Sequence, residues 1–247
     1  MNFLGIIPAR YASTRFPGKP LVDIKGKPMV QWTYENTKKA LDVVYVATDD
    51  ERIKEAVLAF GGNVVMTSPD HPSGTDRCAE AAQKIGEMTG QKFDVVINVQ
   101  GDEPFINPAQ IRELQSCFGP ETELATLVSE ATSVEQLLNP SEAKVVLDNK
   151  RNAILFSRSP IPHVRGVEQS EWLRRHTFYR HIGMYGYRMD VLHQITKLTA
   201  SALEKAESLE QLRWIENGYT IACGITDIES ISVDTPGDLQ NILQSGQ

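Results

Sequence analysis

Four short apolar runs in the first half of the chain limit its fold more than any other feature. They are rich in β-branched residues and do not alternate with polar side chains, which is typical of strands buried on both faces of a parallel sheet. They occupy residues 3–7, 43–48, 64–67 and 94–99. Segments with helical periodicity lie between and after them, over residues 29–40, 51–62, 74–87 and 107–119. This alternation predicts a doubly wound, Rossmann-like α/β sheet.

Helix start and stop signals support this interpretation. Asp49 or Asp50 can cap the second helix, and the glycine pair at 61–62 can end it. Asn107 is a suitable N-cap for the fourth helix, with Pro108 in its first turn. The first half therefore has both the strand pattern and the turn chemistry of an α/β domain.

The second half of the chain is less regular. Strand-like runs at 123–131, 144–149, 153–162 and 181–187 lack long intervening helices. Residues 162–178 form a polar, arginine-rich stretch, and residues 201–218 carry the longest helical pattern. A strand running into a capped helix is expected over residues 230–239. We expect a single domain over residues 1–247, with a mixed sheet and an inserted lobe at about 155–190.

Composition excludes several classes of protein. The 247-residue chain has a net charge of −7, which argues against a general nucleic-acid binder. No apolar run approaches the ~18 residues that span a membrane, and the N-terminus lacks the features of a signal peptide. We therefore expect a cytoplasmic protein. The three cysteines, Cys78, Cys117 and Cys223, are widely spaced, which favours buried thiols over disulfides or a zinc site.

A basic, proline-rich loop follows the first predicted strand. The sequence IIPARYASTRFPGKPL places Arg10, Arg15 and Lys19 within ten residues, together with small residues such as Ser13 and Gly18. Arginine and lysine bind phosphate, and glycine lets the backbone approach an anion closely. Ligands of open α/β sheets bind at the carboxyl ends of strands. The loop is thus either an anion cradle or a solvated basic turn.

Two carboxylates lie at predicted strand ends elsewhere. Asp102 follows the run at 94–99, and Asp234 follows residues 230–233. Mg²⁺ favours one or two carboxylates combined with substrate phosphates, so the two residues are a candidate metal pair. Each also has a simpler interpretation as part of a turn. Thr235 is explained as a helix N-cap with Pro236 in the first turn.

Two further segments carry groups suited to a ligand. The loop SPDHPSGTDR contains Ser73, Gly74 and Arg77, which suit a base or ribose, although Ser73 or Thr75 can simply cap the next helix. A second basic cluster lies between Arg158 and Arg188, with four of the five histidines in or beside it. It is either a solvated loop with a subunit contact or a pocket for a second anion.

These segments together resemble one enzyme family. The motifs IPARYASTRFPGKPL, VATDD, SGTDR, NVQGDEP, FSRSPIP, HIGMYGY, LEQLR and VDTP occur in order over residues 3 to 240, as in the bacterial 3-deoxy-manno-octulosonate (Kdo) cytidylyltransferases, or CMP-Kdo synthetases. The resemblance implies a nucleotide-diphospho-sugar transferase type of fold with a dimerisation lobe, and a homodimer. It also implies transfer of CMP from CTP to Kdo with release of pyrophosphate, for lipopolysaccharide biosynthesis.

The resemblance also implies roles for individual residues, each carried over by its motif. Arg10 and Lys19 would hold the triphosphate with Ser13 nearby, and Asp102 and Asp234 would hold Mg²⁺. Ser73, Gly74, Arg77 and Gln100 would place the cytidine. The residues expected around the sugar acid are Arg15, Arg158, His181, Tyr185, Glu210 and Gln211.

Two alternatives remain from the sequence. One is CMP transfer to another sugar acid, either an 8-amino-Kdo or a sialic acid; the first loop is less rich in glycine and serine than in enzymes resembling the sialic-acid group, which disfavours the latter. The other is a non-catalytic nucleotide sensor of the same fold. A sensor would be expected to lose the metal carboxylates, whereas Asp102 and Asp234 are both present.

Overall fold

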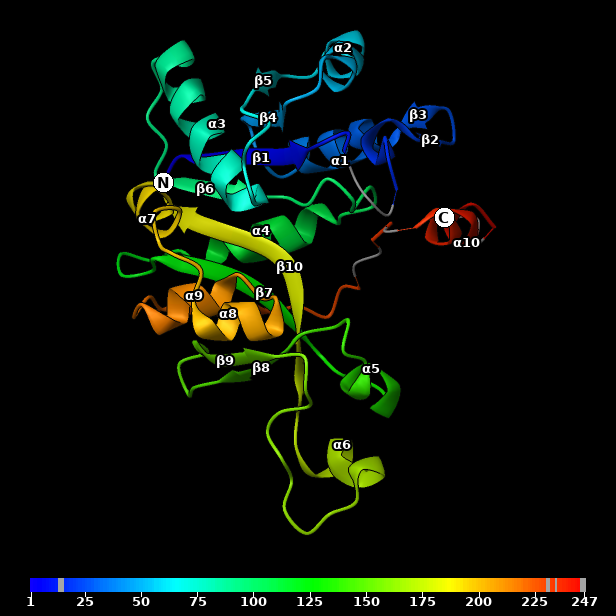
Figure 1. Cartoon of the computed structure of the whole chain (residues 1–247), viewed down its shortest axis with the longest axis vertical. Coiled ribbons are helices and arrows are strands. Elements are labelled where there is room, and N and C mark those ends of the chain that lie inside the picture. The colour runs from blue at the N-terminus through cyan, green and yellow to red at the C-terminus, as the bar shows by residue number, and fades with distance from the viewer. Residues whose placement is uncertain (13–15, 230–231, 234, 245–247) are drawn as a thin grey trace. The chain divides into compact units, whose positions relative to one another are not determined.

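The computed structural model describes residues 1–12, 16–229, 232–233 and 235–244 (Figure 1). The chain divides into two compact units. The first comprises Met1–Arg112, Arg188–Thr196 and Ser230–Gln247, and the second comprises Glu113–Tyr187 and Lys197–Glu229. The lobe expected at about 155–190 thus falls almost wholly in the second unit, which also includes long segments on both sides of it.

The first unit contains the parallel sheet that the apolar runs predict. Its strands are β1 (Phe3–Ala9), β4 (Val44–Thr48), β5 (Val64–Met66) and β6 (Val95–Asn98). They lie in the order β6-β1-β4-β5, and every adjacent pair is parallel. All four residues of β6 are buried, as expected for a strand covered on both faces.

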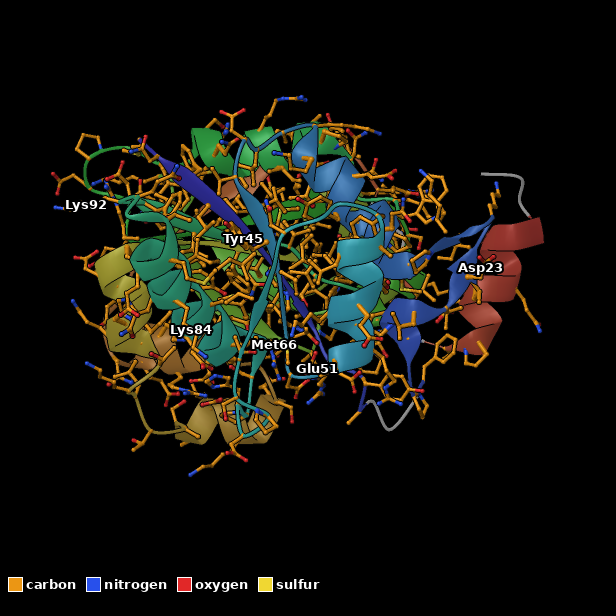
Figure 2. All side chains as sticks on the ribbon, turned by 90° about the horizontal axis from the view of Figure 1, so that it is seen from above. Asp23, Tyr45, Glu51, Met66, Lys84 and Lys92 are labelled. Carbon is orange, nitrogen blue, oxygen red and sulfur yellow. The ribbon has the colours of Figure 1, made fainter. Side chains whose placement is uncertain are left out.

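Helices cover both faces of this sheet. α1 (Met29–Lys38) and α2 (Glu51–Ala59) connect β1, β4 and β5, and α3 (Gly74–Thr89) connects β5 to β6. The first two connections run in one direction across the sheet and the third runs back past β1. Right-handed crossovers therefore place α3 opposite α1 and α2, as Figure 2 shows. The doubly wound prediction is confirmed for this unit.

Smaller elements of the first unit lie outside the sheet. The short 3₁₀ helix η1 (Lys19–Leu21) and a hairpin of β2 (Asp23–Ile24) and β3 (Lys27–Pro28) follow β1, and the sequence analysis did not predict them. α7 (Met189–Ile195) and α10 (Pro236–Gln244) also belong to this unit, and α4 (Pro108–Ser116) begins in it and ends in the second. The side chains of Ile24, Met29 and Val233 form a small core that anchors the hairpin.

The second unit contains a mixed sheet, as predicted. β7 (Leu124–Glu130) pairs in parallel with β11 (Ile221–Ile225) and antiparallel with β10 (Tyr179–Arg188). β8 (Lys144–Leu147) then pairs antiparallel with β10 and with β9 (Ala153–Ser157). The short α5 (Val134–Leu138) follows β7.

The arginine-rich stretch at 162–178 contains more structure than its polarity suggests. It includes η2 (Gln169–Glu171) and α6 (Trp172–Arg175). The indole of Trp172 is buried and stacks on Phe178, with ring centroids 5.9 Å apart, and both pack against Leu137. Two aromatic residues thus give this polar segment its own core.

The single helix expected over 201–218 is wrong. The chain forms two short helices there, α8 (Ala202–Glu207) and α9 (Gln211–Glu216). Ser208 has a φ of 51°, in the left-handed region, which ends α8. Leu203 is 43% exposed, whereas Leu209 and Leu212 are buried. An ion pair between Glu204 and Arg213, 2.6 Å long, joins the two helices.

The end of the chain confirms one local prediction. Thr235 caps α10: its hydroxyl accepts the Asp238 N–H at 3.2 Å, while the Asp238 carboxylate accepts the Thr235 N–H at 2.7 Å. Of the strand expected over 230–233, Ser230 and Ile231 lie outside the described residues, and Ser232 and Val233 are not in a strand. Within the described ranges, no helix has the length and apolar character needed to cross a membrane.

Candidate functional site

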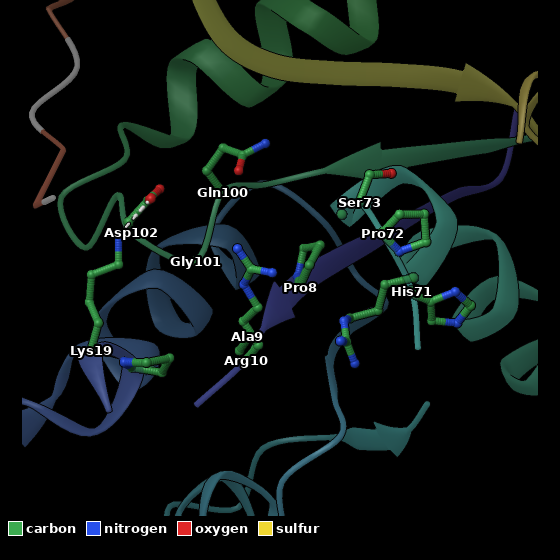
Figure 3. A pocket seen from close by; sticks show the side chains of 13 residues that line it. Pro8, Ala9, Arg10, Lys19, His71, Pro72, Ser73, Gln100, Gly101 and Asp102 are labelled. Carbon is green, nitrogen blue, oxygen red and sulfur yellow. Dashed lines mark hydrogen bonds and ion pairs between the residues drawn. The ribbon is translucent and has the colours of Figure 1, made fainter. Parts of the chain in front are cut away.

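A cavity of about 240 Å³ lies at the carboxyl ends of β1 and β6, where the direction of the strand connections reverses (Figure 3). Open α/β sheets bind ligands at this switch point. The cavity is lined by Pro8, Ala9, Arg10, Lys19, Pro20, His71, Pro72, Ser73, Gly74, Arg77, Gln100, Gly101 and Asp102. It thus brings together seven of the predicted site residues, from three separate segments of the chain.

The turn after β6 must pass very close to β1. A Cβ atom on Gly101 would lie 2.7 Å from the carbonyl oxygen of Pro8, which is too short for a non-bonded contact. A glycine therefore allows the turn to place Asp102 beside the loop after β1. The QGDEP motif thus needs a glycine at this position for a steric reason, which the sequence alone did not reveal.

Lys19 and Asp102 form an ion pair across the cavity wall. The Lys19 Nζ donates to Asp102 Oδ2 at 2.8 Å, as the dashed line in Figure 3 shows. The two side chains are 14% and 29% exposed, so each charge remains partly open to a ligand. A metal-bound triphosphate carries the partner that each group needs, since phosphate oxygens suit the ammonium and a cation suits the carboxylate.

Three predicted residues cannot be placed in this cavity. Ser13, Arg15 and Asp234 lie outside the described residues. The residue before Asp234 is described, however: the backbone N–H of Val233 donates to the carbonyl oxygen of Asp102 at 2.9 Å. The pairing of Asp102 with Asp234 at a metal therefore stays a prediction, with this backbone contact as its structural support.

The N-terminus of α3 forms another wall of the cavity. Ser73 caps this helix, since its Oγ accepts the Asp76 N–H at 3.2 Å and donates to the Asp76 carboxylate at 2.6 Å. Gly74 begins the helix, and its first N–H groups and dipole favour an anion. The capping interpretation of Ser73 is therefore confirmed, although the residue also lines the cavity.

Arg77 lines the cavity with a buried side chain. Its side chain is only 4% exposed, and its guanidinium donates to Thr67 Oγ1 at 2.6 Å and to Asp49 Oδ2 at 3.1 Å. These bonds tie α3 to the ends of β4 and β5. Arg77 thus lines the predicted cytidine site, with its charge already balanced by Asp49.

His71 is a cavity residue that the sequence analysis missed. Its Nε2 contacts the Glu80 carboxylate, which also accepts from the Ser68 N–H and the Lys84 ammonium. Burial acts to raise the pKa of Glu80, but the bonds from Lys84, Ser68 and His71 lower it to about 2. The loop SPDHPSGTDR was already a candidate segment, and the presence of a histidine in it could have identified His71 as a site residue.

Glu103 is a second missed group. Its side chain is buried beside the site, and its Oε2 has no hydrogen-bond partner among the described residues. Burial, helped by the adjacent negative charge of Asp102, raises the pKa of Glu103 to about 7. The sequence gives no signal that separates this carboxylate from an ordinary turn residue.

A second group of predicted residues gathers in the other unit, on β10 and around the start of α9. His181 Nε2 lies 2.9 Å from Thr126 Oγ1, and its ring contacts those of Phe156 and Tyr185 at centroid distances of 5.3 and 5.1 Å. Burial lowers the pKa of His181 to about 4, so the imidazole is neutral at pH 7. The histidine therefore cannot act there as a permanent cation.

Polar atoms in this group lack partners. Tyr185 Oη, Gln211 Nε2 and Trp214 Nε1 are buried, and none has a hydrogen-bond partner among the described residues. The rings of Tyr185 and Trp214 meet edge to face, with centroids 5.1 Å apart. Buried polar atoms are nearly always hydrogen-bonded, so three unpartnered ones are typical of a ligand site. Trp214 was not predicted as a site residue.

Arg158, which was expected near the sugar acid, is bonded to the backbone of its own unit. Its Nε, Nη1 and Nη2 donate to the carbonyl oxygens of Glu207, Pro140 and Ser208 at 2.6, 2.9 and 3.2 Å. Each nitrogen of the guanidinium is thus engaged, and the group fastens the turn that leads to Glu210. Elsewhere in the second basic cluster, Arg174 pairs with Glu171 and Arg180 with Glu142, which supports the structural interpretation for those arginines.

Comparison with known proteins decides the family. The family model for cytidylyltransferases matches residues 4–227. A 3-deoxy-manno-octulosonate cytidylyltransferase of Parabacteroides distasonis is 59% identical over 98% of this chain and 97% of its own length. This chain belongs to the 3-deoxy-manno-octulosonate cytidylyltransferase family. The resemblance noted in the sequence is confirmed.

Other members of this cytidylyltransferase family agree. The enzyme of Bacteroides thetaiotaomicron is 58% identical over 98% of this chain and 96% of its own length. The solved structure of a CMP:2-keto-3-deoxy-manno-octonic acid synthetase complexed with CTP is 41% identical. It covers 100% of this chain and 98% of its own, with a TM-score of 0.90. A cytidylyltransferase of Leptospira borgpetersenii, 14% identical with a TM-score of 0.63, shares the fold.

The low pKa of His181 predicts a pH dependence of stability in this cytidylyltransferase. An unfolded histidine titrates near pH 6.5, so between pH 6.5 and 4 the unfolded chain binds a proton that the folded chain does not. The free energy of unfolding should therefore decrease as the pH is lowered from 6.5 to 4, and this residue should contribute on the order of 1–3 kcal/mol to the decrease. We expect urea unfolding of His181→Asn to show a shallower fall than wild type between pH 6.5 and 4. Parallel curves would contradict the buried, neutral histidine.

Proposed function

We propose that this protein transfers CMP from CTP to 3-deoxy-D-manno-octulosonate, giving CMP-Kdo and pyrophosphate for lipopolysaccharide biosynthesis. The observation that carries this proposal is the ion pair of Lys19 with Asp102 at the switch point, with Arg10 beside it. A cation in the loop after β1 faces a carboxylate in the turn after β6, an arrangement that suits a triphosphate with its bound metal. The names of the 57–59% identical relatives, and of the neighbour solved with CTP, support both substrates.

The reaction is an in-line displacement at phosphorus. The anomeric hydroxyl of the sugar acid attacks the α-phosphorus, the bond to the β-phosphate oxygen breaks, and pyrophosphate leaves. Such transfers depend on positioning and charge neutralisation more than on covalent chemistry by the protein. Arg10 and Lys19 neutralise the triphosphate and the leaving pyrophosphate. The first turn of α3, at Gly74, adds N–H groups at the same cavity.

The site has a donor suited to Mg²⁺. Asp102 presents a partly exposed carboxylate to the cavity, and magnesium binds through one or two carboxylates with substrate phosphates and waters. We infer that Asp102 holds the ion, with Asp234 as its proposed second ligand. When bound, Mg²⁺ supplies charge neutralisation for the phosphates. Among the described residues, no group of three or more acidic, histidine or cysteine side chains offers another metal site.

The unpartnered polar atoms of the second unit suit the sugar acid. A sugar with many hydroxyls can satisfy Tyr185 Oη, Gln211 Nε2 and Trp214 Nε1, which otherwise stay buried without partners. A site built to bind hydroxyls also rejects analogues that lack them, because its own polar groups would then be unpaired. We infer that Tyr185, Glu210 and Gln211 contribute to recognition of the sugar, and that Arg158 acts by fastening the turn before them.

The experiment that tests this function is pyrophosphate release across a matrix of substrates. CTP, UTP, ATP and GTP are each combined with Kdo, 8-amino-Kdo and N-acetylneuraminate in the presence of Mg²⁺. We expect release with CTP plus Kdo and at least tenfold less for the other pairs. Faster pyrophosphate release with 8-amino-Kdo or N-acetylneuraminate would show that this compound, and not Kdo, is the sugar substrate. CTP binding without release for any sugar would favour the nucleotide sensor.

Removing either charge of the ion pair should strongly reduce catalysis without unfolding the protein. We expect Lys19→Ala and Asp102→Asn each to lower kcat/KM for CTP by about 10²-fold or more, since both groups act on charges of the triphosphate. Asp190→Asn, an exposed carboxylate in the first turn of α7, is the control. Circular dichroism checks folding of each variant. Wild-type rates in Lys19→Ala would rule out its triphosphate role.

We also infer a homodimer, as the family resemblance implies. The second unit exposes apolar side chains on β9, with Ile154 55% and Leu155 37% exposed. Covering them against a second copy would remove apolar surface from water. Light scattering at micromolar concentration should give a mass near twice that of the 27.5 kDa chain. Ile154→Glu should shift the mass toward one chain, and a monomeric wild type would refute the inference.

A further inference from the structure

The loop after β1 closes on itself at the two residues next to the phosphate-binding cations. The backbone N–H of Gly18 donates to the carbonyl oxygen of Tyr11 at 3.0 Å. Arg10 directly precedes Tyr11, and Lys19 directly follows Gly18. One backbone hydrogen bond therefore joins the two residues that adjoin the cations on the chain.

The Tyr11 side chain reinforces this closure. A Cβ atom on Gly18 would lie 3.1 Å from the ring carbons Cε2 and Cζ of Tyr11 and 3.2 Å from its Oη. Gly18 also has a φ of 71°, in the left-handed region, where it serves as N-cap of η1. The ring thus packs directly on the glycine backbone at the start of the short helix that carries Lys19.

Arg52 holds the ring from a different element. Its guanidinium carbon lies 3.3 Å from the Tyr11 ring centroid, which is a close cation–π stack. Asp50 fixes the guanidinium in turn, accepting from Nε at 2.9 Å and from Nη2 at 2.6 Å. Asp50 also caps α2 by accepting the Arg52 N–H at 3.0 Å. The stack is therefore anchored on the first turn of a helix that packs against the sheet.

We propose that Tyr11, stacked by Arg52, is a positioning residue that sets the separation of Arg10 and Lys19 for the triphosphate. The proposal rests on the function proposed above. Charge stabilisation works best when the charges are fixed before the substrate arrives, because ordering a loop on binding costs free energy. Tyr11 touches the loop backbone and Arg52, and its effect on the phosphates passes through the neighbouring cations.

This role predicts a loss of binding affinity that affects only the contacts with the β- and γ-phosphates of CTP. Tyr11→Ala removes both the packing on Gly18 and the stack on Arg52, so Arg10 and Lys19 lose their fixed spacing. We expect the dissociation constant for CTP to rise about tenfold or more, while that for CMP changes less than about threefold. Tyr11→Phe keeps the ring and should restore CTP affinity to within about threefold of wild type. Calorimetry measures both constants.

Arg52 offers a matched pair of variants on one helix. Arg52→Ala removes the stack and should weaken CTP binding in the same direction as Tyr11→Ala, by a smaller factor. Lys54→Ala removes another cation from the same turn of α2, one that pairs with Glu51 at 3.0 Å, and should leave CTP binding unchanged. Equal losses in the two variants would show a general charge effect and would overturn the proposal.

A double-mutant cycle between Tyr11 and Gly18 tests the coupling directly. Gly18→Ala adds a Cβ that meets the Tyr11 ring, as well as strain at a positive φ. In a Tyr11→Ala background the clash disappears and the backbone strain remains. Gly18→Ala should therefore reduce CTP affinity less in that background than in the wild-type protein. Additive effects on CTP affinity would show that the contact does not position the loop.

The outcomes separate this inference from the proposed function. If wild type releases pyrophosphate from CTP and Kdo but Tyr11→Ala binds CTP equally well, the positioning role is wrong and the function stands. If Tyr11→Ala weakens CTP and CMP by the same factor, the residue shapes the whole pocket and the proposal fails. If wild type shows no CTP-dependent release, the function itself fails, and the calorimetric comparison still decides the role of Tyr11.

Discussion

The ion pair between Lys19 and Asp102 is the contact on which the candidate site depends. It joins the loop after β1 to the turn after β6, two neighbouring parallel strands that are connected to opposite faces of the sheet. The connections diverge there, and the two loops form walls of a cavity. Gly101 allows the turn to approach Pro8, and that approach brings the carboxylate within reach of the ammonium.

The sequence predicts this half of the site well because the physics is local and directional. Parallel strands place their carboxyl ends at one edge of the sheet, so cations after one strand and a carboxylate after the next are expected to meet. Arg10, Lys19, Gln100 and Asp102 do line one cavity. The helix caps at Ser73 and Thr235 follow from the same kind of short-range pattern.

What the sequence does not predict depends on distant contacts. The break between α8 and α9 needs Ser208 in the left-handed region, a conformation that glycine or asparagine would have signalled and serine does not. The buried Trp172 lies in a polar stretch whose composition suggests a solvated loop. The raised pKa of Glu103 comes from burial, which one sequence cannot show. Arg158 matches a family motif, yet its bonds to three carbonyls appear only in the folded chain.

The two halves of the recognition problem use different physical means. At the proposed nucleotide side, full charges have fixed partners: Lys19 pairs with Asp102 and Arg77 with Asp49, and Arg52 stacks on Tyr11 beside Arg10. At the proposed sugar side, His181 is neutral and the available groups are unpartnered dipoles on Tyr185, Gln211 and Trp214. A triphosphate is recognised by charge, which acts over a distance and tolerates small errors of position. A polyhydroxylated sugar is recognised by hydrogen bonds, which lose their strength within a few tenths of an ångström and therefore need rigid, aromatic-packed walls. The edge-to-face contacts of Trp214 with Tyr185 and Tyr187 provide such packing beside the short helices α8 and α9.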